Sequence, residues 1–185
     1  SDTVTYDGNE HSVSGFTGAP EGADFAGIIT VGAKGPDADT YPAEFAEGTV
    51  GKVDATNKYI ITKATDGALV IDPIKEKTIT ITANSNSKTY DGTPLTDSGY
   101  SYTQGVLVDG DVLTAVVEGS ATNVGDAGKN KVKSYAVMRG EEDVTANYTF
   151  GESVDGKLTI NPRPVTLTSE TASKPYDGTP LTRPN

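Results

Sequence analysis

The chain contains no cysteine and no tryptophan, and it has a single histidine and a single methionine. Without cysteine there is neither a disulfide framework nor a cysteine-based metal site, so a secreted domain of this type must gain its stability elsewhere. Because the chain has no thiol nucleophile, it cannot use Cys-His catalysis. His11 is the only imidazole, and no Ser-His-Asp pattern recurs around it. No glycine-rich phosphate loop is present either. The sequence therefore predicts a protein that is not an enzyme and binds no cofactor.

Positive charge is also scarce, since 15 Lys and Arg residues stand against 26 Asp and Glu residues, for a formal net charge of −11. Such a chain repels phosphate, which argues against binding to nucleic acid or to an anionic membrane surface. No apolar run reaches membrane-spanning length, and the first residues do not form a signal peptide. We therefore expect any targeting or anchoring signals to lie outside this sequence.

What the sequence does contain is an internal repeat. The tripeptide Tyr-Asp-Gly occurs at Tyr6-Asp7-Gly8, Tyr90-Asp91-Gly92 and Tyr176-Asp177-Gly178, and the last two copies share the run YDGTPLT. A second landmark follows, as DGALVIDP ending at Pro73 and DGKLTINP ending at Pro162, and a third is Asn57-Lys58-Tyr59 against Asn147-Tyr148. Landmarks in one order at nearly one period indicate tandem repeats. We predict a first repeat at 1–73, a second repeat at 74–162, and the start of a third at 163–185, called the tail below.

The pattern within each repeat is typical of β-structure. Alternating or β-branched runs predict strands, and they lie at Thr78 to Thr82, Val165 to Thr168, Val112 to Val117, Val132 to Met138, Tyr59 to Thr62 and Leu69 to Ile71. Asp66-Gly67 and Asp155-Gly156 are candidate hairpin turns, and Pro42 to Glu47 is a candidate helical turn. The sequence thus predicts an all-β chain of tandem immunoglobulin-like sandwiches in an elongated row, with β-grasp-like repeats as the alternative.

The recurring Tyr-Asp-Gly motif has a structural interpretation. Tyrosine can bury its ring and bond its hydroxyl, aspartate can close an Asx-turn, and glycine permits a positive φ. We expect Gly92 to have a positive φ and Tyr90 to be mostly buried. The alternative is a weak calcium site formed by Asp91, Asp109 and Asp111, whose carboxylates are of the type that calcium prefers.

The segments KTYDGTPLT, KPYDGTPLT, DGKLTINP and DGALVIDP resemble the YDG/MBG-type repeats of large bacterial surface proteins, especially those of Gram-positive organisms. The resemblance is closest in the second repeat and the tail, and looser in the first, where Asn9-Glu10-His11 replaces Thr-Pro-Leu. It implies a surface-exposed, wall-anchored protein in which such repeats are stacked as spacers or adhesive segments. It implies no catalytic residue.

Two further sets of residues are candidate sites. Tyr100 and Tyr102 lie on one face of a predicted strand, where they could stack on a glycan or pack into the core. Lys77, Glu118 and Asn161 could form an isopeptide bond, although Asn161 could simply precede Pro162 in a linker, and on balance we expect no bond. Two functions follow: a stalk or spacer of an extracellular surface adhesin, or a module that binds host glycan or mucin.

The tail and the first repeat have opposite defects. The tail carries Pro164 to Ser169 ahead of its motif, matching Lys77 to Ala83, whereas the first repeat has only Ser1 to Val4 there, so we expect its first strand to be absent. Val165 and Leu167 would form an unpaired apolar edge, which attracts other strands. We predict that the tail adds as a strand to the first repeat of a neighbouring molecule, giving head-to-tail association, or to the second repeat of its own chain.

Overall fold

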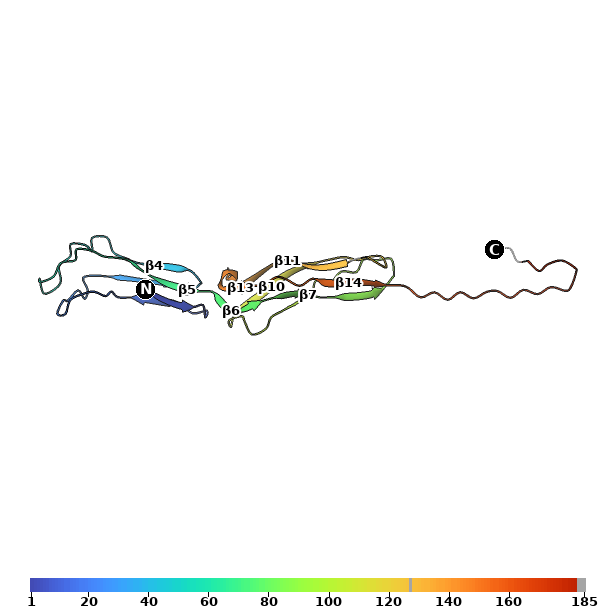
Figure 1. Cartoon of the computed structure of the whole chain (residues 1–185), viewed down its shortest axis with the longest axis horizontal. Coiled ribbons are helices and arrows are strands. Elements are labelled where there is room, and N and C mark those ends of the chain that lie inside the picture. The colour runs from blue at the N-terminus through green and yellow to red at the C-terminus, as the bar shows by residue number, and fades with distance from the viewer. Residues whose placement is uncertain (127, 183–185) are drawn as a thin grey trace.

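The computed structural model describes residues 1–126 and 128–182 and shows two β-structures in a row followed by an extended tail (Figure 1). Almost all regular structure is strand; the described residues form no α-helix and only one short 3-10 turn, η1 (Thr145–Asn147). The prediction of an all-β, sandwich-like chain is confirmed. Residues 183–185, the end of the predicted third repeat, lie outside the described residues.

The first repeat forms one five-stranded sheet with the order β1-β5-β4-β3-β2. Its strands are β1 (Asp2–Thr5), β2 (His11–Ser14), β3 (Val31–Gly35), β4 (Thr40–Phe45) and β5 (Gly67–Asp72). The pairing of β1 with β5 is parallel, and the other pairs are antiparallel. Leu69 and Ile71 of β5 are almost fully buried, as their alternation in the sequence indicates.

The second repeat also has a five-stranded sheet, in which the order β10-β11-β14-β8 corresponds to β3-β4-β5-β1 and β12 is attached to β11. The strands of this repeat are β6 (Ile74–Ile79), β7 (Ile81–Ala83), β8 (Asn86–Thr89), β9 (Tyr100–Tyr102), β10 (Asp111–Glu118), β11 (Gly128–Arg139), β12 (Glu142–Asp143), β13 (Tyr148–Phe150) and β14 (Gly156–Asn161). β6 pairs with β13, and β7 pairs with β9, in two further small sheets. Their buried Ile79 and Ile81 join the same core cluster as Leu113 and Val137 of the larger sheet.

The two repeats share not only strand order but also register. Asp2 of β1 faces Leu69 of β5, and Asn86 of β8 faces Leu158 of β14, both in parallel pairs. On the other side, Gly67 faces Ala43, and Gly156 faces Asn130. The strand that precedes Tyr-Asp-Gly therefore occupies the same place in both repeats. Tyr6 and Tyr90 donate their backbone N–H groups to the carbonyl oxygens of Asp72 and Asn161, the residues that end the paired strands.

Three local predictions are wrong. Pro42 to Glu47 does not form a helical turn, because most of this segment is β4, in which Ala43 is buried and its neighbours are not. Tyr59 to Thr62 makes a single bridge between Ile60 and Val53 instead of a strand. Val165 to Thr168 is not a strand, and Val165 is 80 % and Leu167 91 % exposed.

The two Asp-Gly pairs are also not hairpin turns. Gly67 and Gly156 open β5 and β14, and neither is among the glycines with positive φ. Gly156 is required for a different reason, since a Cβ there would collide with the carbonyl oxygen of Asn84. The glycine thus allows a close approach of two backbones, a use that a sequence pattern does not distinguish from a turn.

Candidate functional site

The Tyr-Asp-Gly turns share one local geometry. The aspartate Oδ1 accepts the backbone N–H two residues on, from Asn9, Thr93 or Thr179, which is the Asx-turn expected. The glycines that follow have φ of +83°, +82° and +76°, so the prediction for Gly92 is confirmed.

Each aspartate also contacts a basic side chain. In the second repeat and the tail a lysine three residues earlier donates to the carboxylate, whereas in the first repeat His11 lies 2.8 Å from Asp7. The N–H of Asn9, followed by the contact with His11, lowers the pKa of Asp7 to about 2. Lys88, followed by the N–H and hydroxyl of Thr93, holds the pKa of Asp91 far below its usual range. These turns are therefore closed by ionised carboxylates at neutral pH.

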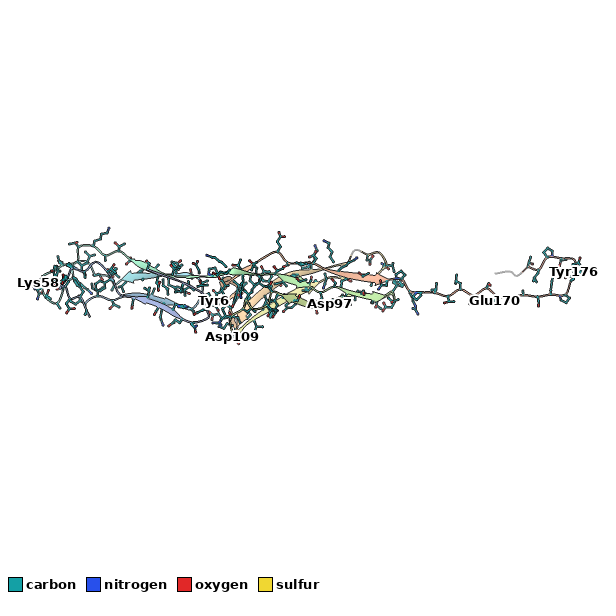
Figure 2. The ribbon with its side chains drawn as sticks, turned by 60° about the horizontal axis from the view of Figure 1, so that its bottom comes forward. Tyr6, Lys58, Asp97, Asp109, Glu170 and Tyr176 are labelled. Atoms are coloured by element: carbon teal, nitrogen blue, oxygen red, sulfur yellow. The ribbon has the colours of Figure 1, made fainter. Side chains whose placement is uncertain are left out.

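The motif tyrosines, by contrast, differ in their surroundings. Tyr6 is 3 % exposed, Tyr90 40 % and Tyr176 97 %, so the prediction that Tyr90 is mostly buried is wrong. Figure 2 shows Tyr6 between the two repeats and Tyr176 at the far end of the tail. The difference follows from their neighbours, since the side chains that cover Tyr6 are Asp111, Arg139 and Tyr148 of the second repeat.

The second repeat receives Tyr6 with three side chains. The Tyr6 ring lies edge-on to Tyr148, with ring centroids 5.9 Å apart, and the guanidinium of Arg139 stands 5.5 Å above the Tyr6 ring centroid. The Tyr6 hydroxyl donates to Asp111 Oδ2 at 3.1 Å. An edge-on aromatic pair and a cation over a ring are both attractive, and burial at the joint strengthens the electrostatic part.

Asp111 is the centre of this joint. Its side chain is fully buried, and it accepts from Arg139 Nε at 2.6 Å and from the Tyr148 hydroxyl at 2.5 Å as well as from Tyr6. Arg139 in turn donates from Nη1 to the carbonyl oxygen of Gly8 at 2.6 Å. Gly8 must be glycine here for two reasons, its positive φ and the guanidinium, with which a Cβ would collide. A buried carboxylate is tolerated because its oxygens are satisfied by a cation and two hydroxyls.

The surroundings of the joint shift the ionisation of its members. Burial, followed by the hydrogen bond to Asp111, raises the pKa of Tyr6 to about 12, and the same two causes raise the pKa of Tyr148 further. The hydrogen bond to Asp111 raises the pKa of Arg139. At neutral pH both phenols of the joint are thus neutral, and Arg139 carries its positive charge beside Asp111. The joint has the groups for holding two repeats together, and none of them is a free nucleophile.

A second contact joins the repeats beside the first. Asn147, at the end of η1, is 1 % exposed; its Oδ1 accepts the backbone N–H of Ala38 at 2.6 Å, and its Nδ2 donates to Asp37 at 2.7 Å. Residues 37 and 38 form the connection between β3 and β4. Two separate contacts, one through Tyr6 and one through Asn147, therefore connect the repeats.

Sequence reasoning identified Tyr6 but missed its receiving residues. Asp111 was proposed only as a calcium ligand, and Arg139, Tyr148 and Asn147 were not proposed as functional. The match of Asn57-Lys58-Tyr59 with Asn147-Tyr148 was the available signal for Asn147 and Tyr148. Nothing in the pattern indicated that this landmark faces the Tyr-Asp-Gly turn of the preceding repeat.

The structure does not bring the proposed calcium ligands together. Asp111 lies at the joint, whereas Asp91 follows β8 at the opposite end of the second repeat and is bonded to Lys88 and Thr93. Asp109 is exposed. Among the described residues there is no group of three or more metal-ligating side chains that could hold an ion.

The proposed glycan platform and isopeptide residues are also placed. Tyr100 and Tyr102 are half-buried and pack against the core, and the Tyr100 hydroxyl donates to the Leu113 carbonyl oxygen, so neither ring is fully presented to solvent. Lys77 donates to the Gly105 carbonyl oxygen near the start of the second repeat. Asn161 ends β14, and the parallel bridge between Thr82 and Val154 sets that end far from Lys77.

Glu118 is exposed at the end of β10. The three isopeptide candidates therefore do not form one cluster.

Within residues 1–126 and 128–182 there is also no helix with the length and apolarity that crossing a membrane requires.

Comparison with known proteins returns no matching family model, no matching curated protein and no matching solved structure.

Proposed function

We propose that this chain is a non-enzymatic, extracellular repeat region that acts as a stalk or spacer in a bacterial surface adhesin. The joint is the observation that carries the proposal. A tyrosine at the tip of the first repeat is buried in the second and held by Asp111, Arg139 and Tyr148. A connection of this kind fixes the direction in which one repeat continues from the last, which is the property a spacer needs.

The linker supports the same function. β5 ends at Asp72 and β6 begins at Ile74, so Pro73 alone connects the two strands. Proline has a fixed φ, and a single residue leaves almost no reach for bending. The two repeats accordingly follow one another along the long axis of the molecule, with the tail continuing from the far end (Figure 1).

The proposed location at the bacterial cell surface rests on the sequence. The YDG/MBG-like segments resemble repeats of Gram-positive surface proteins, and the net charge of −11 suits a solvated, cell-wall-exposed surface. The partners in this proposal are neighbouring repeats of the same chain. Neither nucleic acid nor membrane is a partner of this region.

Small-angle X-ray scattering of the full chain tests the spacer. A compact globule of this length has a radius of gyration of about 16 Å. We expect a value well above this and a distance distribution with the long extension of a rod. A radius of gyration near the compact value would show that the repeats fold back on each other, which is incompatible with a spacer.

The second function, adhesion to host glycan or mucin, is separated from the first by a glycan array. We expect no binding, because Tyr100 and Tyr102 pack against the core. Binding that is lost in Tyr102→Ala and kept in Tyr135→Ala, which alters an exposed tyrosine of β11, would establish the adhesive function instead.

A further inference from the structure

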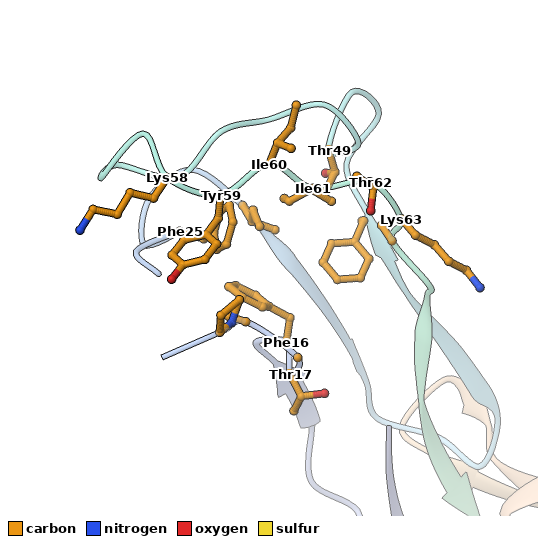
Figure 3. Close-up of a pocket in the computed structure, with 16 residues that line it drawn as sticks. Phe16, Thr17, Phe25, Thr49, Lys58, Tyr59, Ile60, Ile61, Thr62 and Lys63 are labelled. Carbon is orange, nitrogen blue, oxygen red and sulfur yellow. The ribbon is translucent and has the colours of Figure 1, made fainter. Parts of the chain in front are cut away.

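The first repeat carries a cavity of about 400 Å³ near Lys58 (Figure 3). The rings of Phe16, Phe25 and Tyr59 surround it, and Figure 3 shows the charged ends of Lys58 and Lys63 pointing away from it. None of the described residues that line the cavity has an acidic or imidazole side chain. The cavity therefore lacks groups for metal binding or acid–base chemistry, and a stronger candidate for binding lies on the second repeat.

The five-stranded sheet of the second repeat has an apolar patch on its outer face. Val112 and Val116 of the edge strand β10 alternate with buried or half-buried residues, and they are 59 % and 51 % exposed. Met138 and Ser134 stand opposite them on β11, with Ala136 between. Residues directly opposite one another in an antiparallel pair share a face, so these side chains form one surface. Exposed apolar side chains that adjoin in this way mark interaction sites. We call Val112, Val116, Ala136 and Met138 the valine patch.

One end of the same face is basic. Lys129 and Lys131 of β11 and Lys157 of β14 are exposed there, and Lys129 stands directly opposite Lys157. Like charges directly opposite one another destabilise a sheet, so the fold gains nothing from this pair. In the first repeat the same register places Pro42 opposite Ala68. The lysines of this basic end are therefore not required by the fold.

Two carboxylates at the basic end offset only part of its charge. Lys129 Nζ lies 3.4 Å from Asp155 Oδ2, and Glu118 stands opposite Lys131 in the ladder. Lys133, at the irregularity in the pairing of β11, is exposed and adds a fourth lysine. Four lysines against two carboxylates leave a net charge of +2, in a chain whose net charge is −11.

The other end of the face is acidic. Glu141 lies in the turn from β11 to β12, Glu142 and Asp143 form β12, and all three are exposed. Asp143 pairs with Met138 and so shares its face. The hydroxyl and the backbone N–H of Thr145 lower the pKa of Asp143, so its carboxyl is ionised at neutral pH. One face thus carries a basic end, the valine patch and an acidic end in this order.

The two charged ends lie at equal distances from the middle of the face. Thr114 and Ala136 stand opposite each other at this middle. Lys131 pairs with Glu118, which is four residues from Thr114 along β10. In the other direction Gly140, where the acidic turn begins, is four residues from Ala136. At about 3.4 Å per residue, each charged end begins about 14 Å from the middle.

We infer that the outer face of this sheet binds the same face of a second copy of the chain in a two-fold symmetric dimer. The valine patches of the two copies meet at the centre and leave water, which favours association. The basic end of each copy lies against the acidic end of the other, and opposite charges across an interface fix its register. A two-fold interface must be complementary to itself. Opposite charges at equal distances from an apolar centre meet that condition.

The size of the face determines the strength of the dimer. Three strands about 4.8 Å apart and about 35 Å of strand give about 500 Å² per copy. The total of about 1,000 Å² lies in the range of weak and transient interfaces. We therefore expect a dissociation constant in the micromolar range or above.

The symmetry makes the two molecules antiparallel. Figure 1 shows that the strands of the second repeat run along the long axis, and a two-fold axis across the strands reverses their direction. Copies anchored in one cell surface point the same way, whereas copies on two facing cells point toward each other. The dimer therefore suits contact between two cells, a consequence that rests on the proposed function.

Sedimentation equilibrium of the full chain, over a concentration series up to about 1 mM, measures the dimer. We expect the mass to rise from one chain to two and no further, because a two-fold interface closes. Val116→Asp should raise the dissociation constant by about 10-fold or more, since each dimer holds two copies of the changed residue. Val50→Asp is the matched control, because Val50 is 55 % exposed in the first repeat, and it should have no effect. A single-chain mass throughout, a mass beyond two chains, or equal effects of both variants on the dissociation constant would overturn the inference.

Exchange of the charges gives the second test. Lys129→Glu/Lys131→Glu makes both ends of the face acidic, and Glu141→Lys/Glu142→Lys makes both ends basic. Each double variant alone should self-associate at least about 10-fold more weakly, because like charges then meet at both ends. A one-to-one mixture of the two should form a heterodimer at least as tightly as the parent chain forms its dimer, because opposite charges meet again.

Two outcomes of the charge exchange would overturn the inference: no recovery of association in the mixture, or unchanged self-association of either variant alone. Small-angle scattering at concentrations below the dissociation constant tests the spacer by itself. A missing dimer and a compact monomer are therefore distinct results, and each contradicts a different proposal.

Discussion

Asp7, Asp91 and Asp177 each accept the N–H two residues on, and Asp177 does so in a tail whose apolar side chains are exposed. The turn is therefore formed by local interactions, so the roles of its aspartate and glycine could be predicted correctly from the sequence alone. The tyrosine could not, because its burial depends on a repeat that follows it in space. The same motif gives a buried Tyr6 and an exposed Tyr90 with no difference in the tripeptide.

The first prediction concerns the motif glycine. Gly92→Val should destabilise the second repeat by about 1–3 kcal/mol, because valine is strained at a φ of +82°. A Cβ at this position meets no atom within 4 Å, so strain is the whole effect. Thermal unfolding measures it. Gly178→Val is the matched control, since it changes the same motif in the tail and should leave the melting temperature unchanged. Equal effects of both variants on the melting temperature would contradict the structural role assigned to the positive φ of Gly92.

The second prediction is a pH dependence. The pKa of Tyr6 is raised from its ordinary value of 10.0 to about 12, so the folded state favours the neutral phenol. The stabilisation of the folded state by the neutral Tyr6 phenol is then complete below pH 10 and is lost as the pH rises from 10 to 12. The absorbance of tyrosinate, followed during an alkaline titration, should show late-ionising tyrosines that coincide with loosening of the joint.

Tyr6→Phe provides the control for this titration. It removes one late-ionising phenol and one hydrogen bond to Asp111 while keeping the ring. If the late component of the titration were unchanged in Tyr6→Phe, the raised pKa would belong to other tyrosines.

At the scale of elements, the Ile-Thr alternation correctly predicted a strand before the second motif, which the structure divides into β6 and β7 at Thr80. The identical pattern in the tail gave no strand, because alternation records which side chains need burial and not whether a partner sheet is within reach. The two Asp-Gly pairs were wrongly predicted to be hairpin turns for a related reason. Gly156 allows a close contact with the backbone of Asn84, and the sequence does not show that these two residues lie side by side.

The third prediction follows from this pair of equivalent segments. Ile81 is 1 % exposed, so Ile81→Ala should cost about 2–5 kcal/mol in the free energy of unfolding. Leu167 occupies the same place in the tail and is 91 % exposed, so Leu167→Ala should leave the unfolding of the monomer unchanged. Denaturant unfolding at a concentration low enough to keep the chain monomeric compares the two. A cost at Leu167 under those conditions would mean that the tail packs within its own chain.

At the scale of the whole molecule, the two repeats meet through a few side-chain contacts at one joint. The sequence predicted an elongated row from the near-constant period and the short Pro-containing linkers. It did not predict the buried carboxylate at the joint, since Asp111 and Arg139 are distant from Tyr6 in the sequence and are brought to it by the strands β10 and β11.

The last prediction tests the role of this carboxylate. Asp111→Ala leaves Arg139 and two phenol hydroxyls without their shared acceptor, so the free energy of unfolding should fall by about 2–3 kcal/mol. Asp109→Ala changes an exposed carboxylate two residues away and should cost less than about 0.5 kcal/mol. Both values can be measured by denaturant unfolding.

The same variants should differ in how the repeats move against each other. Spin labels on cysteines introduced at the exposed Ser12 and Lys133, one in each repeat, report the distance between them. The distribution should be narrow in the parent chain and in Asp109→Ala, and broad in Asp111→Ala, because Pro73 alone does not resist twisting. If the distribution stayed narrow without Asp111, the contact of Asn147 with Ala38 and Asp37 would be sufficient to hold the joint, and the stiffness would lie there rather than in the buried carboxylate.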